Sequence, residues 1–507
     1  MILLSFFSVL LLILNPVLIY IFRRLEINLQ KYQFWIMVST GIVWVISLVT
    51  FLLKPAQTVN LTWDVGSPLL PSTVFTLDNI TSPLILAINS ILFAAALFQN
   101  YSPEQMAWLS ALGGVSNLCL MADTPYTLLL VLSLIELILI TNFITSKAGG
   151  ETTRRKMLAI IARLLISYLV LFATLGSGIQ SSEVTFSSFS PEAGPSLIAA
   201  GLIASLGWFG FFKKDSTTSS VLMPQIYSEL LPSAIGFMLI LRGSMLVETN
   251  NSGSLAGLVV GVIALAVAFT GYLIKEKGMA WTVTIAGIIA GAAIIGSTQE
   301  VLVLSLVFLL PGYLLMMDYT NKKEAILFLA LASIGIITLP FLPAWSSTLM
   351  FGSGIQGYLF AIAYGLAAGG LLSNRLRDIF DKQLPSGPLG IPLVVGSASI
   401  ILTQLIFAIS TTLVLDGLRF GTFPVASWIP AGMIVIFFMI GNRLPEPSFP
   451  VFEMIPPKLE GIFETALANS TGFVDQVIVV LTGLFEGDGG LIWALLIAFL
   501  IISLGGG

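Results

Sequence analysis

The sequence contains no histidine and only one cysteine, Cys119. Without histidine, the chain lacks the commonest metal ligand and the side chain whose charge changes near neutral pH. A single cysteine excludes a disulfide within the chain and any zinc or iron–sulfur site built on paired cysteines. We therefore expect no metal site, no cofactor and no histidine-based proton relay.

Charged residues are also scarce. They make up 9% of the 507 residues, whereas hydrophobic residues make up 56% and the mean hydropathy is +0.99. A soluble domain is normally about a quarter charged, so this chain cannot cover a water-facing surface and lipid must be its solvent. The net charge of −4 is too small to indicate nucleic acid as a partner. Because the sequence has no phosphate-binding glycine loop, histidine-containing triad or cysteine pair, we do not expect the chain to be an enzyme by itself.

Long apolar runs predict a bundle of membrane-spanning helices. About 20 apolar residues are needed to cross the hydrocarbon core, and sixteen runs reach or approach that length. One or two short runs fit re-entrant segments equally well, so we predict an all-α integral membrane protein with about 14–16 transmembrane helices. The runs cover residues 2–22, 33–53, 83–99, 105–122, 125–145, 157–178, 194–212, 230–247, 254–274, 280–296, 300–317, 325–350, 355–373, 390–415, 427–441 and 489–504.

The basic residues alternate as this number of spans requires. If the loop that contains Arg23 and Arg24 is cytoplasmic, eighteen of the 22 lysines and arginines fall on the cytoplasmic side. Lys54 and Arg419 fall on the other side, and two further arginines fall within spans. This bias follows the positive-inside rule and predicts that both ends of the chain lie outside.

Three ionisable side chains fall well within the predicted spans: Glu136, Arg163 and Arg242. Such groups are costly in lipid and are functional candidates by default. Glu136 lies near the middle of the fifth run, at a depth that either arginine could reach from a neighbouring helix. For Glu136 we favour a function in proton transfer over a paired structural charge. For both arginines we favour side chains that extend toward the lipid headgroups.

Four prolines interrupt or flank the apolar runs. Pro224 and Pro232 flank a polar stretch, and Pro340 and Pro343 fall inside the twelfth run. Proline frees a carbonyl that another group must satisfy, which is tolerated near cavities. Two similar breaks about 115 residues apart favour two repeats with discontinuous helices, the plan of many ion transporters. Ordinary proline kinks explain the spacing equally well.

Five segments, in order, resemble one family of membrane proteins. TLDNITSPLILAINSILFAAALF contains Asp78 and resembles the Asp-Gly-Leu-Ser start of the family's third span, and TPYTLLLVLSLIELILI places Glu136 at the family's essential glutamate. LMPQIYSELLPSAIGFMLILRG, KEKGMAWTVTIAGIIAG and LPFLPAWSSTLM resemble three further family segments, with Arg242 at a helix end and Lys277 at a lysine. The chain thus resembles the antiporter-like subunits of respiratory complex I, Mrp-type cation/proton antiporters and membrane-bound hydrogenases.

This resemblance implies a fold of two inverted five-helix repeats, each with a broken helix. It also implies a mid-membrane path of lysine, histidine and glutamate side chains that carries protons. The ion-translocation candidates are then Glu136, Arg163, Arg242 and Lys277. We expect N-terminal helices in residues 1–104, the first repeat in 105–250, the second in 251–373 and C-terminal helices in 374–507, with an amphipathic interfacial segment near 458–484.

The sequence departs from the family along that path. The seventh run, residues 194–212, contains no lysine, although the family position falls near Gly210. The family lysine after the twelfth-run break falls near Thr348 and is also missing, and the eleventh run lacks histidine and lysine. A proton path needs titratable or hydrated stations a few ångströms apart, so an apolar stretch is a barrier. We therefore expect the fold to be kept and the conduction path to be reduced or lost.

The predicted function is an antiporter-like membrane subunit of a multi-subunit redox or antiporter complex that translocates protons or sodium. Its expected partners are other membrane subunits of that complex and the lipid bilayer. A non-conducting scaffold with the same fold and a stand-alone secondary transporter of a small or lipidic solute are the alternatives. The expected location is the bacterial plasma membrane or an energy-converting internal membrane.

Overall fold

The computed structural model describes most of the chain between residues 2 and 443. The described ranges are 2–25, 29–53, 56–61, 73–98, 102–145, 166–175, 185–207, 225–247, 253–273, 277–317, 319, 321–340, 342–352, 354–381, 385, 390–410 and 425–443. The chain divides into two compact units, of which the first contains Met1–Asn60 and Thr73–Pro445. The predicted last span at 489–504 and the predicted interfacial segment at 458–484 lie outside the described residues.

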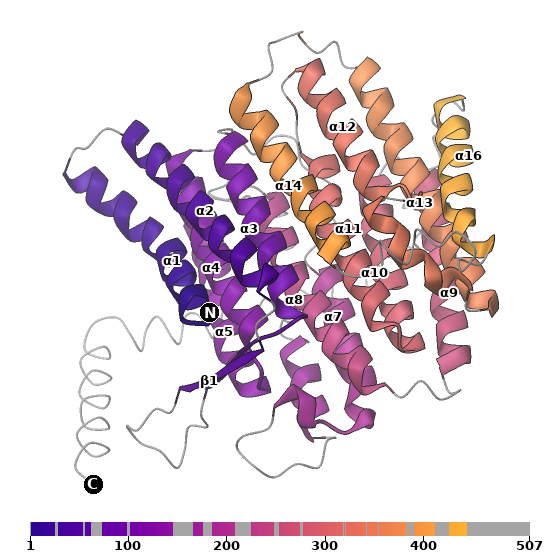
Figure 1. The fold of residues 1–507 in the computed structure, drawn as a ribbon, viewed down its shortest axis with the longest axis horizontal. Coiled ribbons are helices and arrows are strands. Elements are labelled where there is room, and N and C mark those ends of the chain that lie inside the picture. Colours follow the sequence, from indigo (N-terminus) through magenta and orange to yellow (C-terminus); the bar gives the residue numbers. More distant parts are fainter. Residues whose placement is uncertain are drawn as a thin grey trace, which may run out of the picture. The chain divides into compact units, whose positions relative to one another are not determined.

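The first unit is a bundle of helices (Figure 1). The α-helices are α1 (Ile2–Arg24), α2 (Leu29–Leu52), α3 (Thr81–Phe98), α4 (Pro103–Met121), α5 (Pro125–Thr145), Ile166–Leu175, α7 (Gly194–Gly207), α8 (Gln225–Leu246), α9 (Gly253–Leu273), α10 (Lys277–Ile295), α11 (Thr298–Met316), α12 (Lys322–Ile336), α13 (Gly354–Asp381), α14 (Ile391–Ser410) and α16 (Ile429–Arg443). The short 3-10 helices are η1 (Phe186–Ser188), η2 (Pro191–Ala193), η3 (Pro343–Gly352) and η4 (Val425–Trp428). Strands β1 (Gln57–Leu61) and β2 (Thr73–Leu77) pair in a two-stranded sheet.

Seven of the described helices are long and apolar enough to cross a membrane. They contain the stretches Ile2–Ile19, Tyr32–Leu52, Thr81–Phe98, Leu255–Tyr272, Thr298–Met316, Gly354–Asp381 and Ile391–Ile409. Five shorter apolar helices accompany them. Large apolar side chains such as Leu255 on α9 and Ile391 on α14 point outward and are mostly exposed, which is expected where lipid covers a helix bundle. The predicted multi-pass helical membrane protein is confirmed.

The predicted break in the twelfth run is confirmed. Helix α12 ends at Ile336, and the chain re-enters helical structure only at Pro343, where the 3-10 helix η3 begins. Pro340 lies in the irregular stretch between them. The break predicted near Pro232 is wrong, because α8 runs through that residue without interruption. A proline removes one hydrogen bond and kinks a helix, but it does not have to end it. Pro224 lies outside the described residues.

Glycine allows the closest helix contact, between α7 and α8. A Cβ atom added at Gly201 would lie 2.4 Å from the carbonyl oxygen of Gly236, and one added at Gly236 would lie 2.6 Å from the carbonyl oxygen of Gly201. The two backbones therefore touch, as in membrane helix pairs joined through small residues. This contact fixes the middle of α8 against α7.

Gly236→Ala should destabilise the protein by roughly 1–3 kcal/mol, because the methyl group would meet backbone atoms that cannot turn away. The matched control is Gly432→Ala in α16, where an added Cβ atom has no neighbour within 4 Å. Cys119 is the single cysteine and is fully buried, so its labelling by a thiol-reactive dye during heating reports unfolding. Equal melting temperatures for the two variants would contradict this contact.

Candidate functional site

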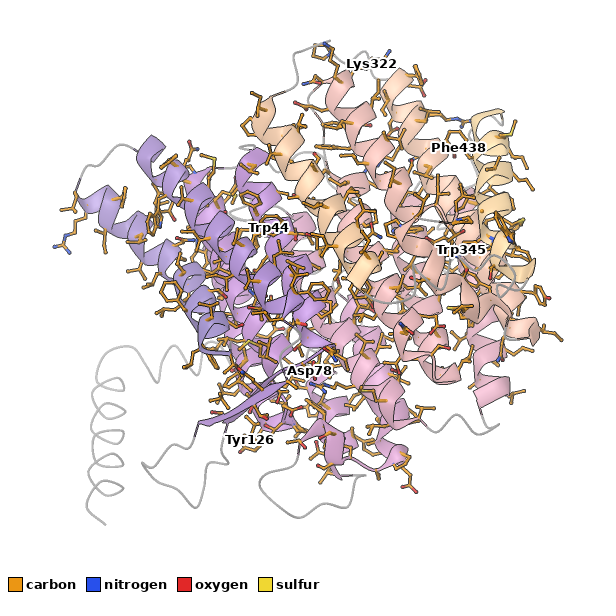
Figure 2. The ribbon with its side chains drawn as sticks, in the orientation of Figure 1. Trp44, Asp78, Tyr126, Lys322, Trp345 and Phe438 are labelled. Atoms are coloured by element: carbon orange, nitrogen blue, oxygen red, sulfur yellow. The ribbon has the colours of Figure 1, made fainter. Side chains whose placement is uncertain are left out.

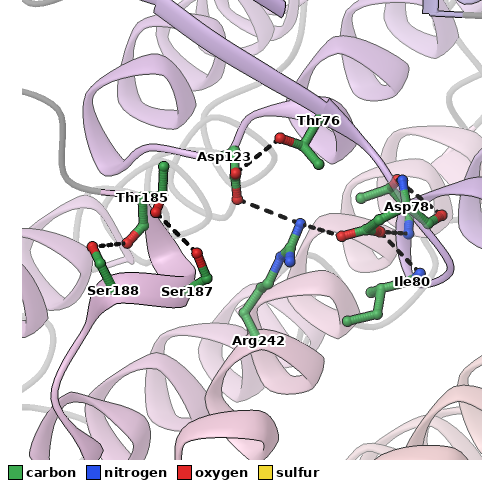
Figure 3. Close-up of polar contacts among 9 residues, drawn as sticks. Thr76, Asp78, Ile80, Asp123, Thr185, Ser187, Ser188 and Arg242 are labelled. Carbon is green, nitrogen blue, oxygen red and sulfur yellow. Dashed lines mark hydrogen bonds and ion pairs between the residues drawn. The ribbon is translucent and has the colours of Figure 1, made fainter. Parts of the chain in front are cut away.

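Three charged side chains from separate parts of the fold meet at one end of the bundle (Figure 3). Arg242 near the end of α8 has its Nη2 atom 2.8 Å from Oδ2 of Asp78 and 3.5 Å from Oδ1 of Asp123. Asp78 precedes α3, and Asp123 lies between α4 and α5. The three residues form what we call the outer charge cluster. It joins α8 to the start of α3 and to the α4–α5 connection.

Asp78 is held by the backbone at the start of α3. Its Oδ1 atom accepts hydrogen bonds from the backbone N–H groups of Ile80 at 2.9 Å and Thr81 at 2.8 Å. Its own N–H donates to Oγ1 of Thr81 at 3.0 Å. A carboxylate in this position satisfies N–H groups that the helix leaves without partners and complements the helix dipole. One oxygen of Asp78 therefore caps α3 while the other contacts Arg242.

Asp123 is held by the strand β2 and by η1. Its N–H donates to the carbonyl oxygen of Val74 at 3.0 Å, and its carbonyl oxygen accepts from the N–H of Phe186 at 2.9 Å. The hydroxyl of Thr76 donates to Oδ2 at 2.8 Å. Burial raises the pKa of Asp123 above its ordinary value of 3.8, although Arg242 and the Thr76 hydroxyl both act to lower it. The nearby carboxylate of Asp78 makes a smaller contribution that also raises the pKa of Asp123.

Arg242 is buried, with a side chain only 8% exposed. Its contacts with the carboxylates are ion pairs by distance, but neither Nη2 nor Nε has the geometry of a hydrogen bond to a described residue. The expectation that Arg242 extends toward the headgroups is therefore wrong, because two buried or partly buried carboxylates compensate its charge inside the protein. Asp123 was not among the residues predicted from the sequence. Because the predicted spans alternate in direction, Asp78, Asp123 and the end of α8 fall on the same side of the membrane, and this was the signal that could have found the cluster.

Glu136 lies deeper along α5 and is half-buried. It is eleven residues beyond Pro125, where α5 begins beside Asp123, and this corresponds to about 16 Å along the helix. Of the two arginines whose depth would allow them to reach Glu136, Arg242 instead pairs with Asp78 and Asp123. The guanidinium lies at the outer end of the helices, not at mid-depth.

The other candidates are only partly described. Arg163 lies outside the described residues. Lys277 is the first residue of α10, and the structure describes its backbone but not its side chain. Among the described residues, no group of three or more Cys, Asp or Glu side chains could hold a metal ion.

The break after α12 is closed by neutral side chains. Nε2 of Gln404 in α14 donates to the carbonyl oxygen of Gly335 at 3.1 Å, and the hydroxyl of Tyr364 in α13 donates to the carbonyl oxygen of Ile336 at 2.7 Å. The hydroxyl of Thr348 donates within η3, to the carbonyl oxygen of Trp345 at 2.6 Å. These bonds satisfy carbonyl groups that the interruption of the helix frees. These hydrogen bonds at the α12 break and at Thr348, near the family's lysine position, therefore come from neutral donors.

Aromatic side chains fill the interior between α8, α10, α11 and α13. Phe237 and Phe308 pack edge to face with ring centroids 5.0 Å apart, and Trp281 and Tyr364 do so at 5.9 Å. Within the part of the chain that the structure describes, the buried charged residues are Asp123, Arg242 and Glu324. Glu324 lies in the first turn of α12, and Figure 2 shows the neighbouring Lys322 at the opposite end of the bundle from Asp78. The fully buried charged residues of the described part thus lie at the ends of the helices, whereas the half-buried Glu136 lies in the middle of α5.

Two solved structures resemble this bundle over nearly its whole length. A chain of the Mrp complex from Dietzia sp. DQ12-45-1b has a TM-score of 0.67 and 12% sequence identity, and the match covers 99% of this chain and 62% of that one. A chain of the membrane-bound sulfane sulfur reductase, an archaeal respiratory membrane complex, has a TM-score of 0.57 and 14% identity, with 98% and 99% covered. This chain has the antiporter-like fold. The predicted fold resemblance is thereby confirmed.

The remaining comparisons show how distant these similarities are. A chain of respiratory complex I from Thermus thermophilus matches at a TM-score of 0.45 with 16% identity, over 85% of this chain and 99% of that one, which is too weak a likeness to extend the conclusion. No protein-family model matches the sequence, and no curated protein matches it. The chain spans about three fifths of the length of the Mrp chain, 62%. At such identities the shared property is the antiporter-like fold.

Arg242→Met should destabilise the protein by on the order of 3 kcal/mol, because it leaves two carboxylates without the charge that compensates them. The matched control is Arg375→Met, which removes the partner of Asp378 in a more exposed pair at 3.9 Å and should cost no more than about 0.5 kcal/mol. Thermal unfolding followed by labelling of Cys119 compares the two. A similar loss in both variants would show that the outer charge cluster is not a special contact.

Asp123 should make the stability fall as the pH rises. Because its folded-state pKa is raised, the folded protein holds a proton that the unfolded chain releases once the pH passes 3.8, and stability is lost from there up to the folded pKa. Asp123→Asn removes this titration. The melting temperature of the variant minus that of wild type should therefore increase as the pH is raised from acidic to neutral. Melting temperatures are measured by intrinsic fluorescence. A constant difference across that range would contradict the raised pKa.

Proposed function

We propose that this chain is an antiporter-like membrane subunit of a multi-subunit ion-translocating complex and that its own ion path is reduced or lost. The antiporter-like fold supports the first part of the proposal. The two chains that share this fold belong to an Mrp complex and to an archaeal respiratory membrane complex. The partners are then other membrane subunits, and the location is a bacterial plasma membrane or an energy-converting internal membrane.

The location of charge supports the second part. A path for protons or sodium needs polar stations through the middle of the bundle, because ions in an apolar stretch meet a large desolvation barrier. The aromatic pairs Phe237–Phe308 and Trp281–Tyr364 fill positions between the central helices. The fully buried charged residues among the described residues lie at helix ends, and Glu136 is a half-buried acidic group at mid-helix. This separation of charge from the interior is the observation that carries the proposal.

Arg242 is better suited to a fixed role than to proton transfer. A guanidinium cannot be deprotonated in proteins, so it cannot pass a proton from one neighbour to the next. Its ion pairs with Asp78 and Asp123 join α8 to α3 and to the α4–α5 connection. We therefore assign the outer charge cluster the role of an electrostatic clamp that closes one end of the first predicted repeat. Glu136, Arg163 and Lys277 remain the candidates for any residual conduction.

The proposal is tested first by purification of a tagged chain in mild detergent and identification of the proteins that accompany it by mass spectrometry. Other antiporter-like subunits and redox or cation-transport proteins are the expected companions. A chain that purifies alone as a monodisperse species would contradict membership in a complex. That result would favour the stand-alone transporter.

Glu136→Gln in the purified complex tests the conducting role separately. Because the described interior offers no row of charged stations, ion translocation by the complex in proteoliposomes should stay within error of wild type. Omission of the whole chain should instead reduce recovery of the assembled complex. A severalfold loss of translocation in the Gln variant, with assembly unchanged, would show that this chain conducts through Glu136 and would refute the reduced path.

A further inference from the structure

Two polar groups without their usual partners lie where α11, at Pro311, faces α10. Pro311 lies inside α11 and has no N–H group, so the carbonyl of Val307, four residues earlier, lacks its intrahelical donor. On the facing helix α10, Trp281 is fully buried, and its Nε1 atom has no hydrogen-bond partner among the described residues. One group can only accept a hydrogen bond and the other can only donate one.

Both groups border the same small space beside Gly312. A Cβ atom added at Gly312 would lie 3.5 Å from Nε1 of Trp281 and 3.7 Å from the carbonyl oxygen of Val307, and no other atom outside the adjoining helix backbone lies within 4 Å of it. Both distances are ordinary contact distances, longer than a hydrogen bond, so a small molecule beside Gly312 would have these two groups as its polar neighbours. Gly312 therefore leaves a notch in α11 that is bordered by the unpartnered indole N–H and by the carbonyl that Pro311 deprives of its usual donor.

We propose that this notch binds one water molecule, which accepts a hydrogen bond from Trp281 and donates one to the carbonyl of Val307. Water has the required combination of donor and acceptor and the size of a single small group. A cation is excluded by the indole N–H, which presents its positive end to the notch, and an anion is excluded by the carbonyl oxygen. Thr284, three residues further along α10 on the same face, is also fully buried with an unpartnered hydroxyl and offers a third group nearby.

The notch lies next to the interruption of α12. A Cβ atom added at Gly335 would meet Cβ and Cγ of Pro311 at 2.8 and 2.9 Å and Oε1 of Gln404 at 2.5 Å, so Pro311 of α11 packs directly on the end of α12. The ring of Trp281 also contacts Tyr364, whose hydroxyl closes the α12 break. The proposed water therefore belongs to a group of neutral hydrogen bonds that satisfies two interrupted helices at once. This inference does not depend on whether the chain conducts ions.

Hydroxyl-radical footprinting of the full-length protein in detergent tests the proposal directly. Radiolysis of a bound water produces radicals beside its contacts, so Trp281 should be oxidised in wild type although it is fully buried. Gly312→Ala places a methyl group in the notch at ordinary contact distances and should reduce that oxidation severalfold. Absence of Trp281 oxidation in wild type, or equal oxidation in both proteins, would overturn the proposal. The wild-type measurement stands even if the variant does not fold.

The melting temperature supplies a second test, because a dry notch and a notch that holds water predict changes of opposite sign. Alanine is a better helix former than glycine and fits the notch without a clash, so Gly312→Ala should raise the melting temperature if the notch is dry. If a water is displaced, the variant should instead melt at a lower temperature, because Trp281 and Val307 lose their partner. In a Trp281→Phe background, which removes the donor, the same alanine should lose most of this penalty. A rise of equal size in both backgrounds would overturn the bound water.

Discussion

Hydrogen bonding of the backbone is the constraint on which the rest of this structure depends. In lipid there is no solvent to satisfy a free N–H or carbonyl group, so each end or interruption of a helix needs a partner from the protein. Asp78 supplies that partner at the start of α3. Gln404 and Tyr364 supply it at the end of α12. These polar residues of the described bundle are best understood by the helix end or helix break whose backbone groups they bind.

This constraint separates two kinds of polar site. At the outer end, where α3 begins and α8 ends, charged groups are used, and one arginine compensates two carboxylates. At the interruption of α12, neutral donors are used instead. A neutral donor satisfies a carbonyl without the desolvation cost of a buried charge. The interior can therefore contain broken helices and still be packed with aromatic rings.

The sequence was sufficient to predict the features that lipid imposes. Apolar runs predicted the helices because a membrane span has one length and one composition, and Pro340 and Pro343 marked a real break. The prediction failed at Pro232, where neighbouring helices decide whether a proline interrupts or only bends a helix. It also failed at Arg242, because the depth of a guanidinium depends on which carboxylates the fold brings to it. Asp78 and Asp123 were visible in the sequence, but their meeting with α8 depends on tertiary packing.

The same requirement for backbone hydrogen bonds explains how an antiporter-like fold can remain stable when its ion path is lost. Stations for ions are specific charged residues whose burial is costly, and replacement of buried charges by well-packed apolar groups is often neutral or stabilising. Edge-to-face packing of Phe237 on Phe308 and the closure of the α12 break by Gln404 and Tyr364 need no charged side chain. The fold needs only apolar helices, small residues where helices touch, and partners for interrupted backbone. A subunit whose complex conducts elsewhere can therefore lose its stations while it keeps its shape and its place among its neighbours.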